Sequence, residues 1–222
     1  VLSVASVMLL GMATNWTAAG LLLLTIVYYA WFYTLMLKRR TPQNIVIGGA
    51  AGALPPVIGW AAATGSAPWQ AWLLFLIIFL WTPPHSWALA LYSAGDYARA
   101  GIPMMPVARG ARSTRLQILL YSLVFTPVAI LPGLVGMGGW IYLAVSIIGG
   151  LGFLGLAAVL FRSRAGDEAD KDTVGREAAL YDVRAAARPA RNLFAFSILY
   201  LMALFAALLV EAASRVPSVS LF

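Results

Sequence analysis

The sequence contains 222 residues, of which 62% are hydrophobic and 10% are charged, and its mean hydropathy is +0.86. Because a soluble domain carries about a quarter charged residues, the chain is predicted to be an integral membrane protein. The lack of cysteine excludes disulfides, thiolate metal sites and cysteine nucleophiles, and the single histidine, His85, excludes a histidine-clustered metal centre within one chain.

Seven apolar runs approach or exceed the roughly 20 residues that a helix needs to cross a bilayer. They cover residues 1–14, 17–37, 44–64, 70–92, 116–135, 139–161 and 192–213. None shows the two-residue alternation of a membrane β-strand. The chain is therefore predicted to be an all-α, polytopic transmembrane helical bundle with about seven spans, forming one domain over residues 1–222. Pro55 and Pro56, together with several glycines, predict a kinked and closely packed third span.

The charges are concentrated in three connections, at residues 38–43, 93–115 and 162–191, which hold 14 of the 15 Lys and Arg residues. Seven alternating spans place these loops on one side of the membrane, and the excess of basic residues predicts that this side is cytoplasmic. The net charge of +7 is thus explained by topology and does not indicate nucleic-acid binding. Loop 162–191 also holds six of the eight acidic residues and is expected to be a solvated helix or a linker. A bacterial cytoplasmic (inner) membrane is the expected location.

Asp96 is the only acidic residue between Val1 and Gly166, and it follows directly on the fourth apolar run. Mg²⁺ is commonly held by one or two carboxylates together with phosphate oxygens of a substrate. Asp96 is therefore a candidate metal ligand, although it could not complete a site alone. The structural alternative is an ion pair with Arg99 or a helix cap.

A basic turn follows the second run, with the sequence Lys38-Arg39-Arg40-Thr41-Pro42-Gln43-Asn44. Such a cluster is often only a topology signal. However, Pro42 interrupts the helix, and cations beside the exposed N–H groups of a new helix suit a phosphate or a diphosphate.

His85 lies in an apolar run that also contains Pro83 and Pro84. Ionisable groups within a bilayer are costly and indicate function, whereas the structural alternative is a neutral ring bonded to a carbonyl that the prolines release. Eleven residues separate His85 from Asp96, so a continuous helix would place both on one face, about 16 Å apart. An aromatic cluster before Lys38 could face a carbocation or form an interfacial belt: Tyr28, Tyr29, Trp31, Phe32 and Tyr33.

Four stretches resemble the signature of the protohaem IX farnesyltransferase (haem O synthase) branch of the UbiA-type intramembrane prenyltransferases. They are Tyr33 to Ala50 with its Thr41-Pro42-Gln43-Asn44 string, Pro55 to Trp60, Leu80 to His85, and Asp96 to Pro106. The resemblance extends from Val1 to about Val210. It implies a nine-helix bundle whose active site opens to the cytoplasm, with Mg²⁺ between two aspartate motifs and the diphosphate of farnesyl diphosphate. The implied reaction transfers the farnesyl group to a vinyl group of haem b, which gives haem O, in the route to haem A and terminal oxidases, and releases diphosphate.

The resemblance also implies roles for individual residues. Asp96 would be the metal ligand, and Lys38 and Arg39 would hold the leaving diphosphate. The implied substrate-binding residues are Tyr33, Asn44, His85 (as a haem or cavity contact) and Arg99. The implied partners are farnesyl diphosphate, haem b, the lipid bilayer and haem A synthase or oxidase assembly factors, with no nucleic acid.

The sequence departs from the family pattern in two respects. The first aspartate motif, which the family carries after its second helix, is absent, so the seven runs correspond to family helices three to nine. In the second motif, Tyr92 and Ala100 stand four residues from Asp96, where relatives often have a second Asp. Since the sequence also opens at Val1 inside an apolar run, we expect an N-terminally incomplete enzyme that is inactive on its own. The alternatives are a UbiA-type prenyltransferase with a quinone or chlorophyll-type acceptor, and a small multi-span transporter built on broken helices.

Overall fold

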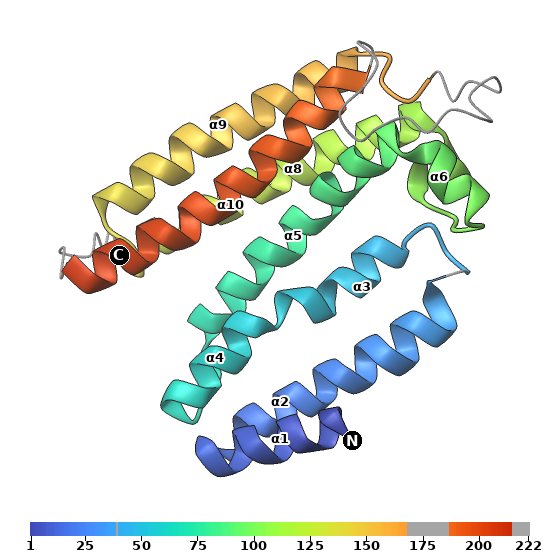
Figure 1. Ribbon diagram of the computed structural model, residues 1–222. Helices are drawn as coiled ribbons and strands as arrows, with labels where there is room; N and C mark the ends of the chain where they lie inside the picture. The colour runs from blue at the N-terminus through green and yellow to red at the C-terminus, as the bar shows by residue number, and fades with distance from the viewer. Residues whose placement is uncertain (39, 168–186, 215–222) are drawn as a thin grey trace. The chain divides into compact units, whose positions relative to one another are not determined.

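The computed structural model of the chain describes residues 1–38, 40–167 and 187–214, and every regular element in them is a helix (Figure 1). The elements are α1 (Leu2–Ala13), α2 (Trp16–Val27), the π-helix η1 (Tyr28–Leu37), α3 (Asn44–Ala53), α4 (Pro55–Thr64), α5 (Trp69–Tyr92), α6 (Ala94–Arg99), α7 (Met105–Arg109), α8 (Ala111–Leu134), α9 (Trp140–Arg162) and α10 (Arg188–Ser214). The prediction of an all-α protein is confirmed.

Six helical stretches among the described residues are long and apolar enough to cross a membrane: α2 with η1, α3 with α4, α5, α8, α9 and α10. The run expected at residues 1–14 forms α1, an apolar helix of 12 residues that is shorter than these six. Two boundaries also differ from the prediction, since α8 begins at Ala111 and α10 at Arg188. Arginines that suggested loop sequence lie on helical ends, where a long cationic side chain can remain in water while the backbone continues its hydrogen bonding.

The chain divides into two compact units, residues 1–79 (unit 1) and 80–222 (unit 2). In unit 1, α1 and α2 form a hairpin whose turn is organised by Asn15. The Asn15 side chain accepts a hydrogen bond from the N–H of Ala18, which caps α2, and its Nδ2 donates to the carbonyls of Ala61 and Ala62 in α4. The predicted kink of the third span is confirmed, because α3 ends and α4 begins on either side of Leu54, directly before Pro55 and Pro56.

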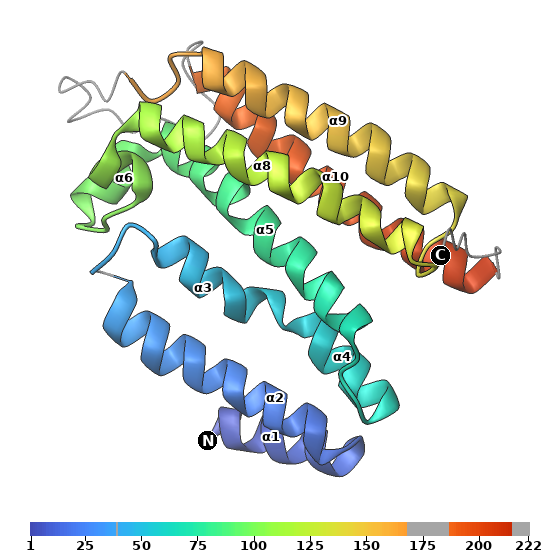
Figure 2. The same ribbon diagram turned by 180° about the vertical axis from the view of Figure 1, so that it is seen from behind.

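In unit 2, α8, α9 and α10 lie side by side along their length (Figures 1 and 2). Their shared core contains Phe125, Phe153 and Tyr200, whose ring centroids are 5.3 to 6.1 Å apart. The Tyr200 ring fits because α9 has glycine beside it: a Cβ built on Gly149 would lie 2.3 Å from a Tyr200 ring carbon. Small residues therefore set the close approach of α9 and α10, as they do in many membrane helix pairs.

The charged ends of α8 and α9 are joined by Arg115, whose side chain is buried. Its guanidinium forms two hydrogen bonds with the Asp167 carboxylate, at 2.9 and 3.0 Å, and a third with the carbonyl of Ala165. The start of α8 and the chain after α9 are thus held together at one end of unit 2. The remainder of the expected loop 162–191, from 168 to 186, lies outside the described residues.

Glu211, near the end of α10, is a buried carboxylate that sequence reasoning did not single out. It accepts hydrogen bonds from the N–H groups of Gly139, Ile141 and Tyr142, at 2.5, 2.7 and 3.1 Å. These donors belong to the first turn of α9, where no carbonyl within the helix is available to them. The negative charge also suits the positive end of the helix dipole.

We expect Glu211→Ala to lower the free energy of unfolding by about 2 kcal/mol or more, because it leaves buried N–H groups of α9 without acceptors. Glu211→Gln retains one acceptor oxygen and should cost less. Thermal unfolding of the two variants and the parent protein in detergent micelles measures the difference. Equal midpoints for all three proteins would contradict the role of Glu211 as a cap.

Candidate functional site

The predicted aromatic cluster lies on η1, a π-helix of 10 residues. π-Helices are rare and most occur as single turns, often at functional sites. Its aromatic residues four apart are in ring contact, with centroids 5.3 Å apart for Tyr28–Phe32 and for Tyr29–Tyr33. The side chain of Thr34 donates to the carbonyl of Tyr29, five residues earlier, which matches the pitch. The sequence predicted a helix here and gave no indication of its type.

The basic turn is held between η1 and α3 by two hydrogen bonds. Tyr28 donates its hydroxyl proton to the carbonyl of Ile47 at 2.8 Å. Asn44 donates from Nδ2 to the carbonyl of Lys38 at 3.1 Å. Asn44 is 1% exposed, and its Oδ1 has no hydrogen-bond partner among the described residues. The side-chain amide of Asn44, which was expected to contact substrate, therefore also holds the backbone at Lys38 in place.

Lys38 itself is exposed and ends the π-helix, with its N–H bonded to the carbonyl of Tyr33 at 2.9 Å. Arg39, the second expected diphosphate contact, lies outside the described residues. Tyr33, Lys38 and Asn44 are thus joined by hydrogen bonds within unit 1.

Gly48 of α3 permits the approach of Tyr33. A Cβ on Gly48 would lie 2.4 Å from a ring carbon of Tyr33, a distance that real contacts do not reach. Gly52, one turn later on the same helix, has no atom within 4 Å of the corresponding position. The two glycines therefore differ in function, although the sequence gives no sign of it.

We expect Gly48→Ala to lower the free energy of unfolding by about 1–3 kcal/mol, because the added methyl group overpacks the contact with Tyr33. Gly52→Ala is the matched control and should be neutral or stabilising, since alanine favours a helix more than glycine does. Thermal unfolding in detergent compares the two. In a Tyr33→Ala background the penalty of Gly48→Ala should vanish, and an undiminished penalty there would rule out the ring as its cause.

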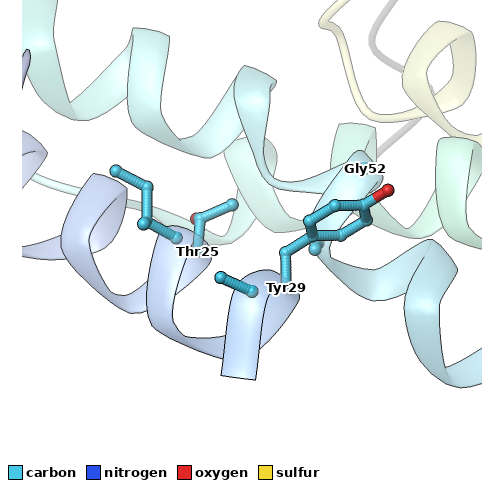
Figure 3. A pocket seen from close by; sticks show the side chains of 6 residues that line it. Thr25, Tyr29 and Gly52 are labelled. Atoms are coloured by element: carbon cyan, nitrogen blue, oxygen red, sulfur yellow. The ribbon is translucent and has the colours of Figure 1, made fainter. Parts of the chain in front are cut away.

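An apolar hollow of about 310 Å³ lies beside this aromatic helix, within unit 1 (Figure 3). Figure 3 shows Thr25 and Tyr29 from the α2–η1 span and Gly52 from α3 around it. The remaining lining residues are Ile26, Ala30 and Ala51. With a single tyrosine and a single threonine as its polar side chains, the hollow suits an apolar group.

Asp96 and Arg99 form an exposed ion pair on α6, in unit 2. The pair joins Arg99 to Oδ1 of Asp96, and no hydrogen bond to Oδ2 is present among the described residues. Because both groups are exposed, the pair adds little to stability, and either partner can exchange it for another ligand. Burial, and then the nearby Asp96 carboxylate, raise the pKa of the Tyr97 hydroxyl, which keeps it protonated as a donor.

The expected alignment of His85 with Asp96 on one continuous helix is wrong. α5 ends at Tyr92, the chain bends at Ser93, and α6 begins at Ala94. The N–H groups of Asp96 and Tyr97 bond to the carbonyl of Ser93 and start the new helix. The 93–115 connection, expected as a loop, therefore holds α6, α7 and the start of α8.

His85 is enclosed by residues from α5 and α10. Its ring stacks between those of Trp81 and Phe194, with centroids 4.1 and 4.6 Å away and planes inclined by 18° and 23°. Its Nδ1 is 2.7 Å from Oγ of Ser197. The expected alternative, a bond to a carbonyl released by the prolines, is not the one found, and α5 remains helical through Pro83 and Pro84.

Sequence reasoning did not identify Trp81, Phe194 or Ser197 as neighbours of His85. The position of Trp81, four residues earlier on the same helix, was an available signal, because such residues share a face. Ser197 is 112 residues away in the chain, and only its hydroxyl within an apolar run hinted at a role.

No group of three or more His, Cys, Asp or Glu side chains suited to a metal lies in the described part of the chain. A metal site at Asp96 would therefore take its other ligands from a substrate. Diphosphate oxygens are such ligands for Mg²⁺, and the Asp96 side chain is exposed.

The six long apolar helices define a multi-pass integral membrane protein. The profile of the UbiA prenyltransferase family matches residues 1–177, and the chain belongs to that family.

Curated relatives of the chain carry the name protoheme IX farnesyltransferase. The protein from Caulobacter sp. (strain K31) is 62% identical over 100% of this chain and 66% of its own length. The protein from Caulobacter vibrioides is 65% identical over 97% and 66%, and that from Maricaulis maris is 61% identical over 95% and 63%. The chain thus spans just under two thirds of the length of these relatives. No solved structure matches the chain.

Proposed function

We propose that the two units form a single prenyltransferase domain, which transfers a farnesyl group from farnesyl diphosphate to a vinyl group of haem b. The observation that carries this proposal is the 61–65% identity to relatives named for that activity, over 95–100% of this chain. In the reaction, the C–O bond to diphosphate breaks and a C–C bond to the vinyl group forms. Water then supplies the hydroxyl group of haem O and loses a proton.

We assign the binding of the diphosphate group to the basic turn. Lys38 is exposed at the end of η1, and the amide of Asn44 anchors the backbone of the turn. A cationic group held in place before the reaction stabilises negative charge as it develops on a leaving group. In this proposal Lys38 and Arg39 receive the diphosphate, and Asn44 keeps the turn in its receptive shape.

We assign Asp96 the role of an Mg²⁺ ligand. In this proposal the metal with its diphosphate takes the place of Arg99, which pairs with Asp96 in the structure. Mg²⁺, when bound, neutralises the diphosphate and so assists its departure. The protonated hydroxyl of Tyr97, the neighbour of Asp96, is suited to donate to the same anion.

The hollow beside η1 favours the binding of the isoprenoid chain, because its lining is apolar and its wall carries the ring of Tyr29. An aromatic face attracts a cation, so Tyr29, whose ring is in contact with that of Tyr33, would favour an allylic carbocation over water. His85, clamped between two aromatic rings, is proposed as a contact of haem b. We place the basic turn and α6 on the cytoplasmic side of a bacterial inner membrane, following the excess of basic residues there.

We expect Asp96→Asn in the full-length protein to reduce haem O formation by about 10²-fold or more, because one ligand of the metal loses its charge. Asp167→Asn is the control, since it removes another carboxylate from the same unit without touching the proposed site. Haem O is measured by chromatography and mass spectrometry in membranes that contain equal amounts of each protein. Full activity of Asp96→Asn would exclude the metal role.

We expect Gly52→Leu to raise the KM for farnesyl diphosphate about tenfold, because the new side chain fills part of the hollow. The shorter geranyl diphosphate should be affected less. Gly20→Leu on α2 is a matched control, because a Cβ there also meets nothing within 4 Å. Equal effects of the two substitutions, or of Gly52→Leu on both substrates, would place the isoprenoid elsewhere.

The alternative acceptor classes predict different products from the same assay. A quinone or chlorophyll-type acceptor would yield a prenylated product of another mass, with no haem O formed.

A further inference from the structure

The bond between His85 and Ser197 determines which ring nitrogen of the histidine carries the proton. The Ser197 hydroxyl lies 2.7 Å from Nδ1 of His85 and 2.5 Å from the carbonyl oxygen of Phe194. A hydroxyl has one proton to donate, and a carbonyl can only accept. The proton of Ser197 therefore goes to Phe194, and the serine oxygen accepts from Nδ1–H. In the neutral ring the lone pair is then on Nε2.

The surroundings of the ring hold this arrangement in place. Trp81 and Phe194 cover its two faces, which limits rotation of the ring plane. Trp81 also donates from Nε1 to the backbone carbonyl of Ser197 at 2.8 Å. Ser197 is therefore bonded to α5 at two points, through its carbonyl to Trp81 and through its hydroxyl to His85. A ring turned over by 180° would put a carbon atom in place of Nδ1 opposite the hydroxyl and lose the bond.

The other ring nitrogen is left available. Among the described residues no hydrogen bond reaches Nε2 of His85, and this atom is not among the fully buried polar atoms without a partner. A histidine that ligates a metal usually donates its second ring N–H to an acceptor, which fixes the tautomer and makes the free nitrogen a better electron donor. The Ser197–Phe194 pair provides such an acceptor.

We infer that Ser197 is a positioning residue that holds His85 in the Nδ1–H tautomer and so presents the Nε2 lone pair to the substrate. This inference deepens the proposed function. It rests on that function for the identity of the atom that receives the Nε2 lone pair, which is the iron of the haem b substrate. Ligation of the iron would orient the porphyrin, while the reacting vinyl group at its edge remains free.

The tautomer can be measured directly, because His85 is the only histidine in the sequence. In ¹⁵N-histidine-labelled protein in lipid bilayers, without substrate, solid-state NMR separates protonated from unprotonated ring nitrogens. We expect Nδ1 protonated and Nε2 unprotonated. Ser197→Ala should change the ratio of the two tautomers about tenfold toward Nε2–H, the size expected for one lost hydrogen bond, and Ser197→Thr should restore it.

Ser122→Ala is the matched control. Ser122 is a buried serine of α8 in the same unit, and its hydroxyl donates to the carbonyl of Ile118 at 2.7 Å. Its loss should leave the His85 resonances unchanged. A protonated Nε2 in the parent protein, or an unchanged spectrum in Ser197→Ala, would overturn the positioning role whatever reaction the protein performs.

A binding experiment tests whether the haem iron is the group that Nε2 of His85 ligates. Binding of haem b to the same variants is monitored by absorption spectroscopy. Ser197→Ala should weaken haem binding about 10- to 100-fold, Ser197→Thr should recover it, and the KM for farnesyl diphosphate should not change. If the NMR experiment shows the expected tautomers but Ser197→Ala binds haem b as tightly as the parent protein, the assignment of the haem iron as the ligand of Nε2 would be overturned. A parent protein that binds no haem but shows the expected tautomer would instead contradict the proposed function.

Discussion

Inside a bilayer a backbone N–H or C=O that leaves its helix finds no water, and the structure depends on the few polar side chains that replace it. Asn15 binds two carbonyls of α4 while it caps α2. Glu211 accepts three N–H groups at the start of α9. Each of these residues joins two helices through backbone groups, so the same bond that satisfies a helix end also fixes how that helix packs.

Two tyrosine rings fit between helices because a glycine lies opposite each of them. Tyr33 lies against Gly48, and Tyr200 lies against Gly149. A glycine that admits a ring trades helix propensity for close packing. At these two positions the missing side chain makes room for a tyrosine ring between two helices.

The same kind of tie holds two of the residues to which we assign roles in the proposed function. The amide of Asn44 holds the backbone at Lys38, and the hydroxyl of Ser197 holds the ring of His85. In both cases a buried polar residue orients a neighbour that remains accessible to a ligand. Positioning of this kind is what electrostatic catalysis requires, because groups already in place need no reorganisation when charge develops.

From the sequence alone, the membrane class, the helical fold and the kink at Pro55 and Pro56 could be predicted. These features follow from hydropathy and from proline chemistry, both of which are local. Sequence reasoning overestimated the continuity of the helix after His85, because the bend at Ser93 depends on which carbonyl captures the N–H groups of Asp96 and Tyr97. The capping by Glu211 and the pairing of His85 with Ser197 could be known from the tertiary structure only. These depend on contacts between residues as far as 112 positions apart, and nothing in the local pattern of one sequence specifies which distant helix will supply the partner.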